Sequence, residues 1–318
     1  MKLSLIIPFL NEEENIQSLI DAIQRSVEPL GMRYELVFVN DGSTDKSQEI
    51  IVKNIRESTQ RIKIIELMRN YGQTAAIAAG IDNSDGEIVI LLDADMQNDP
   101  ADIPLLLEKL DEGYDVVSGW RKNRKDNFLL RILPSKIANG LISTVTGLKL
   151  HDYGCTLKAY RRKYLSKFRL YGEMHRFIPV YAQDSGAKVT EVVVNHHPRT
   201  KGKSKYGLDR VLKVILDLFT VKFLMSYSAK PMRFFGGVGL LLMGLSSGVL
   251  VFLALRRIIL STSVMNSPFF AVSIIMFIMG FFSLSFGLIA ELLIRTYFET
   301  QGKSTFSIRS IIESESEK

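Results

Sequence analysis

The chain has 318 residues, of which 40 are Lys or Arg and 34 are Asp or Glu, so its formal net charge is +6. A basic chain of this length favours anionic partners and can bury a core in one large or two modest domains. Its single cysteine, Cys155, excludes an intramolecular disulfide and fits a reducing compartment.

The first 120 residues alternate apolar, strand-like runs with amphipathic segments. The strand-like runs are LSLIIPF (3–9), YELVFVN (34–40), IKIIELM (62–68), EIVILLD (87–93) and YDVVSGW (114–120). Helical patterns lie between them, at residues 12–27, 45–57, 73–81 and 100–112. This alternation predicts an α/β fold with a doubly wound, mostly parallel sheet. The first run is followed by three acids, which suits a strand and not a signal peptide.

Two acids with one residue between them follow the fourth run. In an extended chain, the side chains of Asp93 and Asp95 point to one side, at the strand end where open α/β sheets bind ligands. Such a pair repels unless a cation lies beside it, and Mg²⁺ is commonly held by one or two carboxylates together with substrate phosphates. Gln97 offers a third oxygen on that side, and Asp41 ends a second strand. Solvated turn residues are the alternative.

The carboxyl-terminal third contains two uncharged apolar stretches, residues 234–255 and 267–290. Each is long enough to cross a bilayer as a helix, whereas two core helices of a soluble protein are the alternative. Arg256 and Arg257 lie between the stretches. The excess of basic residues on the outer flanks predicts a membrane hairpin with both termini in the cytoplasm. Those flanking residues are Lys222, Lys230, Arg233, Arg295, Lys303 and Arg309.

The segment before the first stretch alternates apolar and charged residues. It predicts either a helix in the membrane interface or an amphipathic helix packed on the soluble part. We therefore expect a soluble domain over 1–206, an amphipathic helix over 207–231, a two-helix hairpin over 232–295 and a tail over 296–318. The polar ending IIESESEK is expected to be disordered.

Several motifs between Met1 and Gly207 resemble the family 2 glycosyltransferases with the GT-A fold, and in particular the polyprenyl-phosphate glycosyltransferases. They include IIPFLNEEENI, VFVNDGSTD, LMRNYGQTAAIAAGI, LLDADMQNDP, VVSGWRKNR, GEMHRFIP and HHPRTKGKSKYG. The two carboxyl-terminal stretches resemble the bactoprenol glucosyltransferase and aminoarabinose-transferase branch. The resemblance covers about two thirds of the chain.

The resemblance implies a role for each matching residue. The nucleotide sugar would be held by Pro8, Leu10, Glu12, Val39, Asp41, Asp93, Ala94, Asp95, Arg199 and Lys205. Mg²⁺ or Mn²⁺ would be held by Asp93, Asp95 and Gln97. The acceptor phosphate would be met by Arg121, Arg131, Ser135, Arg199 and Lys205. Asp93, Asp95 and Arg121 would be catalytic, with Asp152 either positioning the acceptor or acting as a weak base.

The implied reaction is inverting, metal-dependent transfer of one sugar to undecaprenyl (polyprenyl) phosphate at the cytoplasmic face of the plasma (inner) membrane. Glucose from UDP-glucose is the first choice of donor, and GDP-mannose or a UDP-aminoarabinose derivative is the alternative. A phosphomonoester has a second pKa of about 6, so it is already an anionic nucleophile and needs little or no base. A membrane-anchored regulator that binds a nucleotide sugar without turnover is an alternative from another class.

Other partners and reactive side chains receive simpler interpretations. A homo-oligomer is expected, and nucleic acid is not, because only Tyr206 accompanies the basic run as a stacking residue. His196 and His197 would point to opposite faces of a strand, which is poor metal geometry. Cys155 is interpreted as structural and not as a nucleophile.

Overall fold

The computed structural model describes residues 2–57, 61–122, 133–165, 174–198, 231–260, 267–299 and 307–314. Arg131, Arg199, Lys205 and the amphipathic segment expected over 207–231, except its last residue, lie outside these residues. The chain divides into two units. A globular unit comprises Met1–Val221 and Ser304–Lys318, and a second unit comprises Lys222–Lys303.

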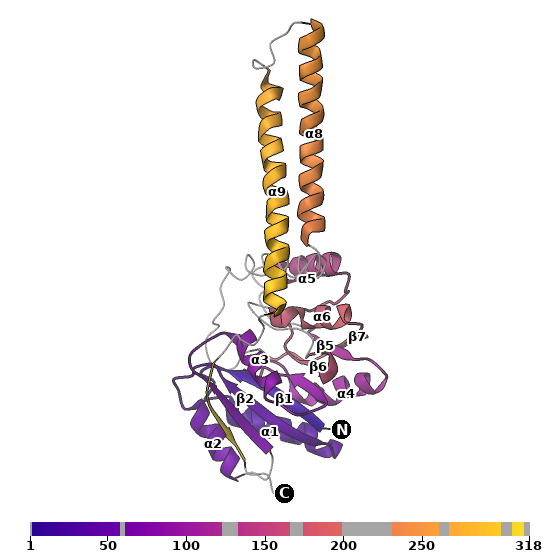
Figure 1. Ribbon diagram of the computed structural model, residues 1–318. Helices are drawn as coiled ribbons and strands as arrows, with labels where there is room; N and C mark the ends of the chain where they lie inside the picture. Colours follow the sequence, from indigo (N-terminus) through magenta and orange to yellow (C-terminus); the bar gives the residue numbers. More distant parts are fainter. Residues whose placement is uncertain are drawn as a thin grey trace. The chain divides into compact units, whose positions relative to one another are not determined.

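The globular unit is built on one mixed sheet of eight strands in the order β7-β5-β6-β4-β1-β2-β3-β8 (Figure 1). The neighbours β4, β1, β2 and β3 are parallel, and so are β5 and β7, whereas β6 and β8 run antiparallel to their neighbours. The predicted doubly wound, mostly parallel sheet is confirmed. Five strands match the predicted runs: β1 (Lys2–Phe9), β2 (Arg33–Asn40), β3 (Arg61–Leu67), β4 (Ile88–Leu91) and β5 (Val116–Trp120).

Helices cover both faces of the sheet, which explains why its central strands are apolar on both sides. One core cluster joins the sheet to α1, α2 and α4, and the other joins it to α3 and α6. The helices of this unit are α1 (Ile16–Val27), α2 (Ser47–Glu57), α3 (Gln73–Asp82), α4 (Ile103–Asp111), α5 (Leu133–Thr146) and α6 (Ile178–Asp184). Short turns of helix are η1 (Glu28–Leu30), η2 (Pro100–Asp102), η4 (Arg162–Tyr164) and η5 (Met174–Phe177).

Three strands are additions to the prediction: β6 (Lys158–Arg161), β7 (Val189–Val193) and β8 (Ile308–Glu313). The expectation of a disordered ending is wrong for residues 311–313, because they belong to β8, which pairs antiparallel with β3. The β-branched residues of this segment favour a strand, and pairing covers the edge that β3 would otherwise expose. Residues 308–313 thus add an edge strand beside β3.

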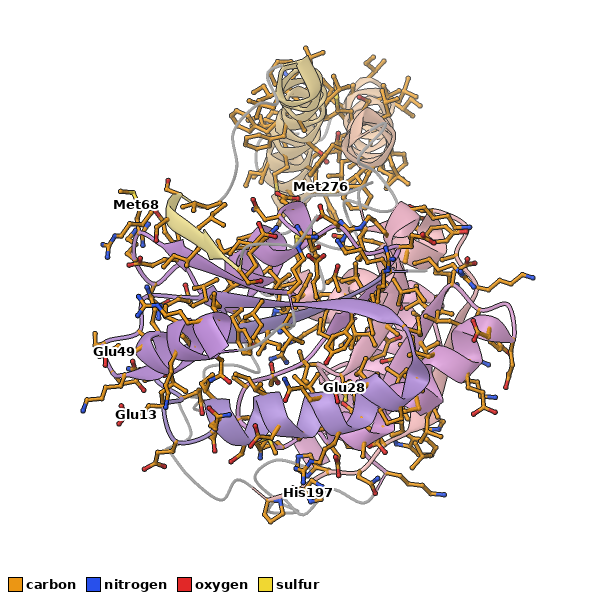
Figure 2. All side chains as sticks on the ribbon, turned by 90° about the horizontal axis from the view of Figure 1, so that it is seen from below. Glu13, Glu28, Glu49, Met68, His197 and Met276 are labelled. Atoms are coloured by element: carbon orange, nitrogen blue, oxygen red, sulfur yellow. The ribbon has the colours of Figure 1, made fainter. Side chains whose placement is uncertain are left out.

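The second unit contains two helices, α8 (Pro231–Leu260) and α9 (Pro268–Glu299). Their apolar parts, Phe234–Ile259 and Pro268–Ala290, are long and apolar enough to cross a membrane. Large apolar side chains project outward from both helices (Figure 2), and Phe252 is 62% and Ile258 77% exposed. Such a surface is unusual for a protein surrounded by water, and it fits a lipid environment.

The two helices contact each other through small residues. A Cβ atom built on Gly239 would lie 2.7 Å from the carbonyl oxygen of Gly280. The hydroxyl of Ser283 donates a hydrogen bond of 2.8 Å to the carbonyl oxygen of Phe235 on the other helix. Close backbone approach and inter-helix hydrogen bonds are the forces that hold helices together in lipid.

Replacing Gly239 with Leu should weaken this hairpin, because the new side chain would overlap the backbone of α9. Overpacking of this kind costs about 1–3 kcal/mol, so the midpoint of thermal unfolding in detergent should fall. Gly248→Leu is the matched control, since no atom lies within 4 Å of a Cβ built there. Equal midpoints for the two variants would contradict the described packing.

Candidate active site

Asp93 and Asp95 lie just beyond the carboxyl end of β4, in the middle of the sheet. Main-chain pairing continues one residue past the strand, where the amide of Leu92 donates to the carbonyl oxygen of Ile6 at 3.1 Å. Burial raises the pKa of Asp93 to about 6, and the neighbouring carboxylate of Asp95 adds to the rise. The charge of Asp95 thus acts directly on Asp93, which is the electrostatic cost of two acids following one strand.

Several groups around Asp93 favour its charged form. The Gln73 side-chain amide, at the first position of α3, donates a hydrogen bond of 2.7 Å to Asp93 Oδ1. A hydrogen bond from Thr156 and the charges of Arg121 and Lys158 act in the same direction on its pKa. Asp93 thus sits among donors and cations that lessen the repulsion from Asp95.

The loop after the two acids turns sharply at Met96, which has a positive φ of 57°. This turn brings the backbone amide of Gln97 to 3.1 Å from Asp95 Oδ1, so it donates a hydrogen bond to that oxygen. Ala94 is buried in the core. Met96 adopts a conformation that non-glycine residues use infrequently, as happens at sites where the surroundings determine the backbone.

Among the residues that the structure describes, no group of three or more His, Cys, Asp and Glu side chains is arranged to hold a metal. Asp93 and Asp95 offer hard carboxylate oxygens, which are the ligands that Mg²⁺ and Mn²⁺ prefer. A cation at this pair would have to take further ligands from water or from a bound molecule. The two acids therefore fit a divalent ion that binds together with a phosphate-containing ligand.

Arg121 and Asp152 form a buried, bidentate ion pair. Arg121 Nε lies 2.7 Å from Asp152 Oδ2, and Arg121 Nη2 lies 3.0 Å from Asp152 Oδ1. Although burial opposes the charged form of Arg121, the carboxylate of Asp152 holds the pKa of the guanidinium above its ordinary value. Asp152 Oδ1 also accepts a hydrogen bond of 3.0 Å from the amide of Gly154. These contacts make Asp152 a partner that orients Arg121.

Lys158, at the start of β6, is a buried cation beside this pair. Its side chain is 2% exposed in the fold, and its Nζ donates a hydrogen bond of 2.9 Å to the carbonyl oxygen of Tyr153. Burial lowers the pKa of Lys158 to about 8. Burial also raises the pKa of the Cys155 thiol to about 11, which agrees with its interpretation as structural.

The loops after β1 and β2 form one wall of the site. Pro8 and Val39 are partners on these neighbouring strands, and both residues are buried. Leu10 is half-buried where β1 ends. The amide of Glu12 donates a hydrogen bond of 2.9 Å to Ser47 Oγ, which ties the two loops together.

Asp41 braces a third loop against this wall. Its carboxylate accepts hydrogen bonds from the amides of Tyr71 at 2.7 Å and Gly72 at 3.0 Å. Burial raises its pKa despite these two hydrogen bonds, which act in the opposite direction. A carboxylate has about four lone-pair positions, so this bracing leaves room for a ligand donor as well.

Of the remaining positions predicted to meet the acceptor phosphate, one is described by the structure and three are not. Ser135 is half-buried in the first turn of α5, while Arg131, Arg199 and Lys205 lie outside the described part of the chain. The two adjacent histidines have different neighbours. His196 pairs with Asn98 as an isolated β-bridge, and His197 Nε2 lies 2.9 Å from Asp99 Oδ2.

Three site residues have no role in the sequence interpretation: Gln73, Thr156 and Lys158. Gln73 lies inside the motif LMRNYGQTAAIAAGI, and its place at a helix start beside a strand end is the signal that could have indicated it. Thr156 and Lys158 approach Asp93 only because β6 inserts between β4 and β5. No spacing in the sequence indicates that insertion.

Asp152→Asn should lower the free energy of unfolding by about 3–5 kcal/mol, because it leaves the buried Arg121 guanidinium without its carboxylate. Replacing both partners, Arg121→Met with Asp152→Leu, should recover much of that loss. Denaturant unfolding of the purified protein measures both. Glu112→Gln removes an exposed partner of Lys109 and should leave the free energy of unfolding nearly unchanged. A loss as small for Asp152→Asn would contradict the buried pair.

Because its pKa is lowered in the fold, Lys158 should make the free energy of unfolding depend on pH. Its pKa is about 8 in the folded protein and 10.5 ordinarily, so the unfolded chain binds more protons between these values. Stability should therefore rise with pH in that window, by at most about 1.4 kcal/mol per pH unit. Lys158→Met should remove this rise in denaturant titrations at pH 8, 9 and 10, whereas the exposed Lys163→Met should keep it. The same slope in both variants would refute the assignment.

Comparison with known proteins shows the family of this chain. The family model of glycosyl transferase family 2 matches residues 4–169, more than half of the chain. Dodecaprenyl-phosphate galacturonate synthase of Rhizobium johnstonii is 39% identical over 320 residues, covering 100% of this chain and 95% of that protein. Undecaprenyl-phosphate 4-deoxy-4-formamido-L-arabinose transferase of Salmonella paratyphi B is 36% identical over 317 residues, covering 99% and 95%.

Solved structures share the fold of the globular unit. S. aureus TarS 1-349 with UDP-GlcNAc has a TM-score of 0.50 and 19% identity, covering 70% of this chain and 67% of that chain. Glucosyl-3-phosphoglycerate synthase of Mycobacterium tuberculosis, with Mn²⁺, UDP and phosphoglyceric acid, has a TM-score of 0.50 and 19% identity, covering 70% and 78%. At this identity the likeness concerns the fold alone. The chain belongs to glycosyl transferase family 2 and has its GT-A type of fold.

Proposed function

We propose that this protein transfers one sugar from a nucleotide donor to polyprenyl phosphate, with inversion at the anomeric carbon. The observation that carries the proposal is the pair of mutually repelling carboxylates at the strand end, backed by the buried Arg121–Asp152 pair. Support comes from the relatives that match over nearly the whole chain, because their names specify dodecaprenyl and undecaprenyl phosphate.

Asp93 and Asp95 would hold Mg²⁺ or Mn²⁺, with the side chain of Gln97 as a further oxygen donor. Support comes from the raised pKa of Asp93, since repulsion between two acids is relieved when a divalent cation binds. When bound, the ion would neutralise negative charge on the departing nucleoside diphosphate. Gln73 and the Gln97 amide would keep the two carboxylates oriented.

Arg121 would stabilise the phosphate groups that meet at the reacting centre. Asp152 binds the Nε and Nη2 edge of the guanidinium. Within the described part of the chain, the Nη1 group is therefore the one that would be left to bind a phosphate oxygen. Because Asp152 is bound to Arg121, we assign it a positioning role and not that of a base. The lipid phosphate is anionic at neutral pH and needs no base to attack. Ser135, Arg131, Arg199 and Lys205 are proposed to complete the phosphate contacts.

The loops around Asp41 would receive the nucleoside, with Pro8, Leu10, Glu12, Val39 and Ala94 lining that side. UDP-glucose is the donor that the motif resemblance favours. The two full-length relatives are named for galacturonate and for 4-deoxy-4-formamido-L-arabinose, so one architecture serves different sugars. UDP-galacturonate and a UDP-linked formamido-arabinose are therefore tested beside UDP-glucose.

We place the protein in the inner membrane with its globular unit and both termini in the cytoplasm. The strand β8 follows α9 in the chain and pairs with β3, so the segments on both sides of the hairpin belong to one globular unit. If α8 and α9 both cross the bilayer, these two segments must lie on the same face. The basic residues flanking the spans favour the cytoplasmic face. The acceptor lipid would then meet the site at that surface.

A transfer assay tests the proposal. The purified protein in detergent is offered undecaprenyl phosphate with labelled UDP-glucose, UDP-galacturonate, UDP-formamido-arabinose or GDP-mannose, with and without a chelator. We expect an organic-extractable glycolipid from one donor, lost with chelator and reduced about 100-fold or more by Asp95→Asn. Asp111→Asn, an exposed acid at the end of α4, is the control and should keep full activity.

Equal product with chelator and with Asp95→Asn would contradict the metal assignment. Nucleotide binding without glycolipid from any of the four donors would favour a non-catalytic, sugar-nucleotide-binding regulator.

A further inference from the structure

The strand β8 begins on the side of the sheet where the parallel strands end and finishes on the side where they begin. In its pairing with β3, Ile308 is the partner of Leu67 and Glu313 is the partner of Lys63. The carboxyl ends of the parallel strands face the site, so the Ile308 end of β8 lies on that side. The two ends make different sets of polar contacts.

At the site end, Arg309 and Ser310 hold Glu66, the second-last residue of β3. Arg309 Nη1 lies 2.8 Å from Glu66 Oε1, and Ser310 Oγ donates to Glu66 Oε2 at 2.9 Å. Burial alone would raise the pKa of Glu66, but hydrogen bonds from Ser310, Arg309 and Gln48 bring it below its ordinary value. Glu66 is therefore a fixed, charged acceptor.

From Glu66, hydrogen bonds lead to the turn that carries Asp41. The Gln48 side-chain amide donates to Glu66 Oε2 at 3.5 Å and accepts a hydrogen bond from Asn40 Nδ2. Buried Asn40 directly precedes Asp41, and its Oδ1 accepts a hydrogen bond of 2.7 Å from the amide of Ser43. A side-chain network thus connects β8 to the Asp41 turn.

A second route leads from β8 to the loop that Asp41 braces. Arg309 Nη2 donates to the carbonyl oxygen of Met68 at 3.1 Å, and the Met68 amide donates to the carbonyl oxygen of Ser307 at 3.0 Å. Three and four residues later, the amides of Tyr71 and Gly72 donate hydrogen bonds to the Asp41 carboxylate. Arg309 therefore contacts Glu66, which is linked by hydrogen bonds to the Asp41 turn. It also contacts Met68, at the start of the loop whose amides bind Asp41.

We propose that β8 is part of the support of the nucleotide site: Arg309 and Ser310 position the two loops around Asp41 and thereby set the affinity for the nucleotide donor. This inference rests on the proposed function, because only there is Asp41 assigned to the nucleotide. Arg309 is a positioning residue and does not itself touch the donor. The segment after the second apolar helix then serves the catalytic unit as well as closing its sheet.

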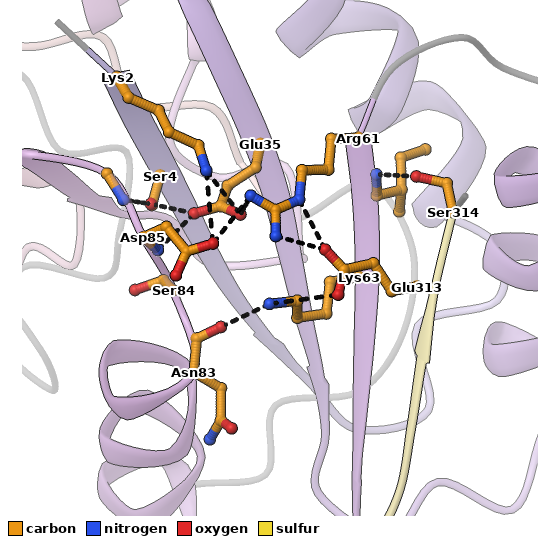
Figure 3. Close-up of polar contacts among 12 residues, drawn as sticks. Lys2, Ser4, Glu35, Arg61, Lys63, Asn83, Ser84, Asp85, Glu313 and Ser314 are labelled. Atoms are coloured by element: carbon orange, nitrogen blue, oxygen red, sulfur yellow. Dashed lines mark hydrogen bonds and ion pairs between the residues drawn. The ribbon is translucent and has the colours of Figure 1, made fainter. Parts of the chain in front are cut away.

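The opposite end of β8 provides the control. Glu313 accepts a hydrogen bond of 2.6 Å from Arg61 Nε, and its other oxygen lies 3.6 Å from Lys63 Nζ (Figure 3). Arg61 also pairs with Glu35, which is fully buried and accepts hydrogen bonds of 2.6 Å from Ser4 Oγ and the Asp85 amide. This cluster lies at the amino ends of the parallel strands, away from Asp41. Glu313→Gln therefore loosens the same strand without reaching the nucleotide loops.

The experiment compares Arg309→Ala with Glu313→Gln in the full-length protein. Dissociation constants for the nucleoside diphosphate and KM values for the active donor are measured, together with kcat, the KM for undecaprenyl phosphate and the thermal midpoint. We expect Arg309→Ala to raise the donor KM and the nucleotide dissociation constant about 3- to 10-fold, with kcat and the acceptor KM little changed. Glu313→Gln should lower the midpoint and leave the donor KM unchanged.

Two further variants test the route. Arg309→Lys should not restore affinity, because one ammonium group cannot serve Glu66 and the Met68 carbonyl together as the guanidinium does. Glu66→Gln combined with Arg309→Ala should weaken binding by less than the product of the single effects.

An unchanged donor KM in Arg309→Ala, or the same rise in Glu313→Gln, would overturn the inference. A wild-type protein that binds no nucleotide and makes no glycolipid would instead refute the proposed function itself.

Discussion

The repulsion between Asp93 and Asp95 is the constraint on which the rest of the site depends. Both acids follow one buried strand, and burial together with their proximity raises the pKa of Asp93 to about 6. Such a pair destabilises a fold unless other groups offset it, which is why Gln73 and Thr156 hydrogen-bond Asp93. Two acids kept together at this cost fit the divalent cation of the proposed function.

The cations near this pair are also buried, and burial disfavours their charged forms. Arg121 is buried only because Asp152 takes two of its donor groups, and Asp152 is held in turn by the Gly154 amide. Lys158 lacks such a carboxylate partner among the described residues, and its lowered pKa records the cost. Acids and cations thus interact closely near this strand end, which suits the proposed ligand of a divalent ion with phosphates.

The sequence predicts the fold well where the signal is local. Five strands and the helices between them follow from alternating hydrophobic runs, and each lies within a few residues of its predicted bounds. The strands β6 and β8 escape prediction for a common reason. The short strand β6 carries a charged residue at each end, Lys158 and Arg161, and β8 needs a partner strand more than 200 residues earlier in the chain. Only the tertiary fold makes either segment a strand.

The site, like the fold, combines features with a local signal in the sequence and features that depend on which strands become neighbours. The position of Asp93 and Asp95 beyond a strand can be predicted from the residues, whereas a role for Arg121 is predicted only through the family resemblance. The bidentate contact of Asp152, and the support from Lys158 and Arg309, depend on which strands become neighbours. Resemblance to a family indicates which residues take part in the chemistry. It does not indicate which hydrogen bonds orient them, and those are what the structure adds.

The most direct test of this account is to locate Mn²⁺ by anomalous diffraction in crystals of the full-length protein grown with Mn²⁺ and UDP. The account predicts one strong anomalous peak between the carboxylates of Asp93 and Asp95, in contact with the diphosphate, and its loss in Asp95→Asn. A peak at another place in the globular unit, or a diphosphate bound with no ion at these acids, would contradict it.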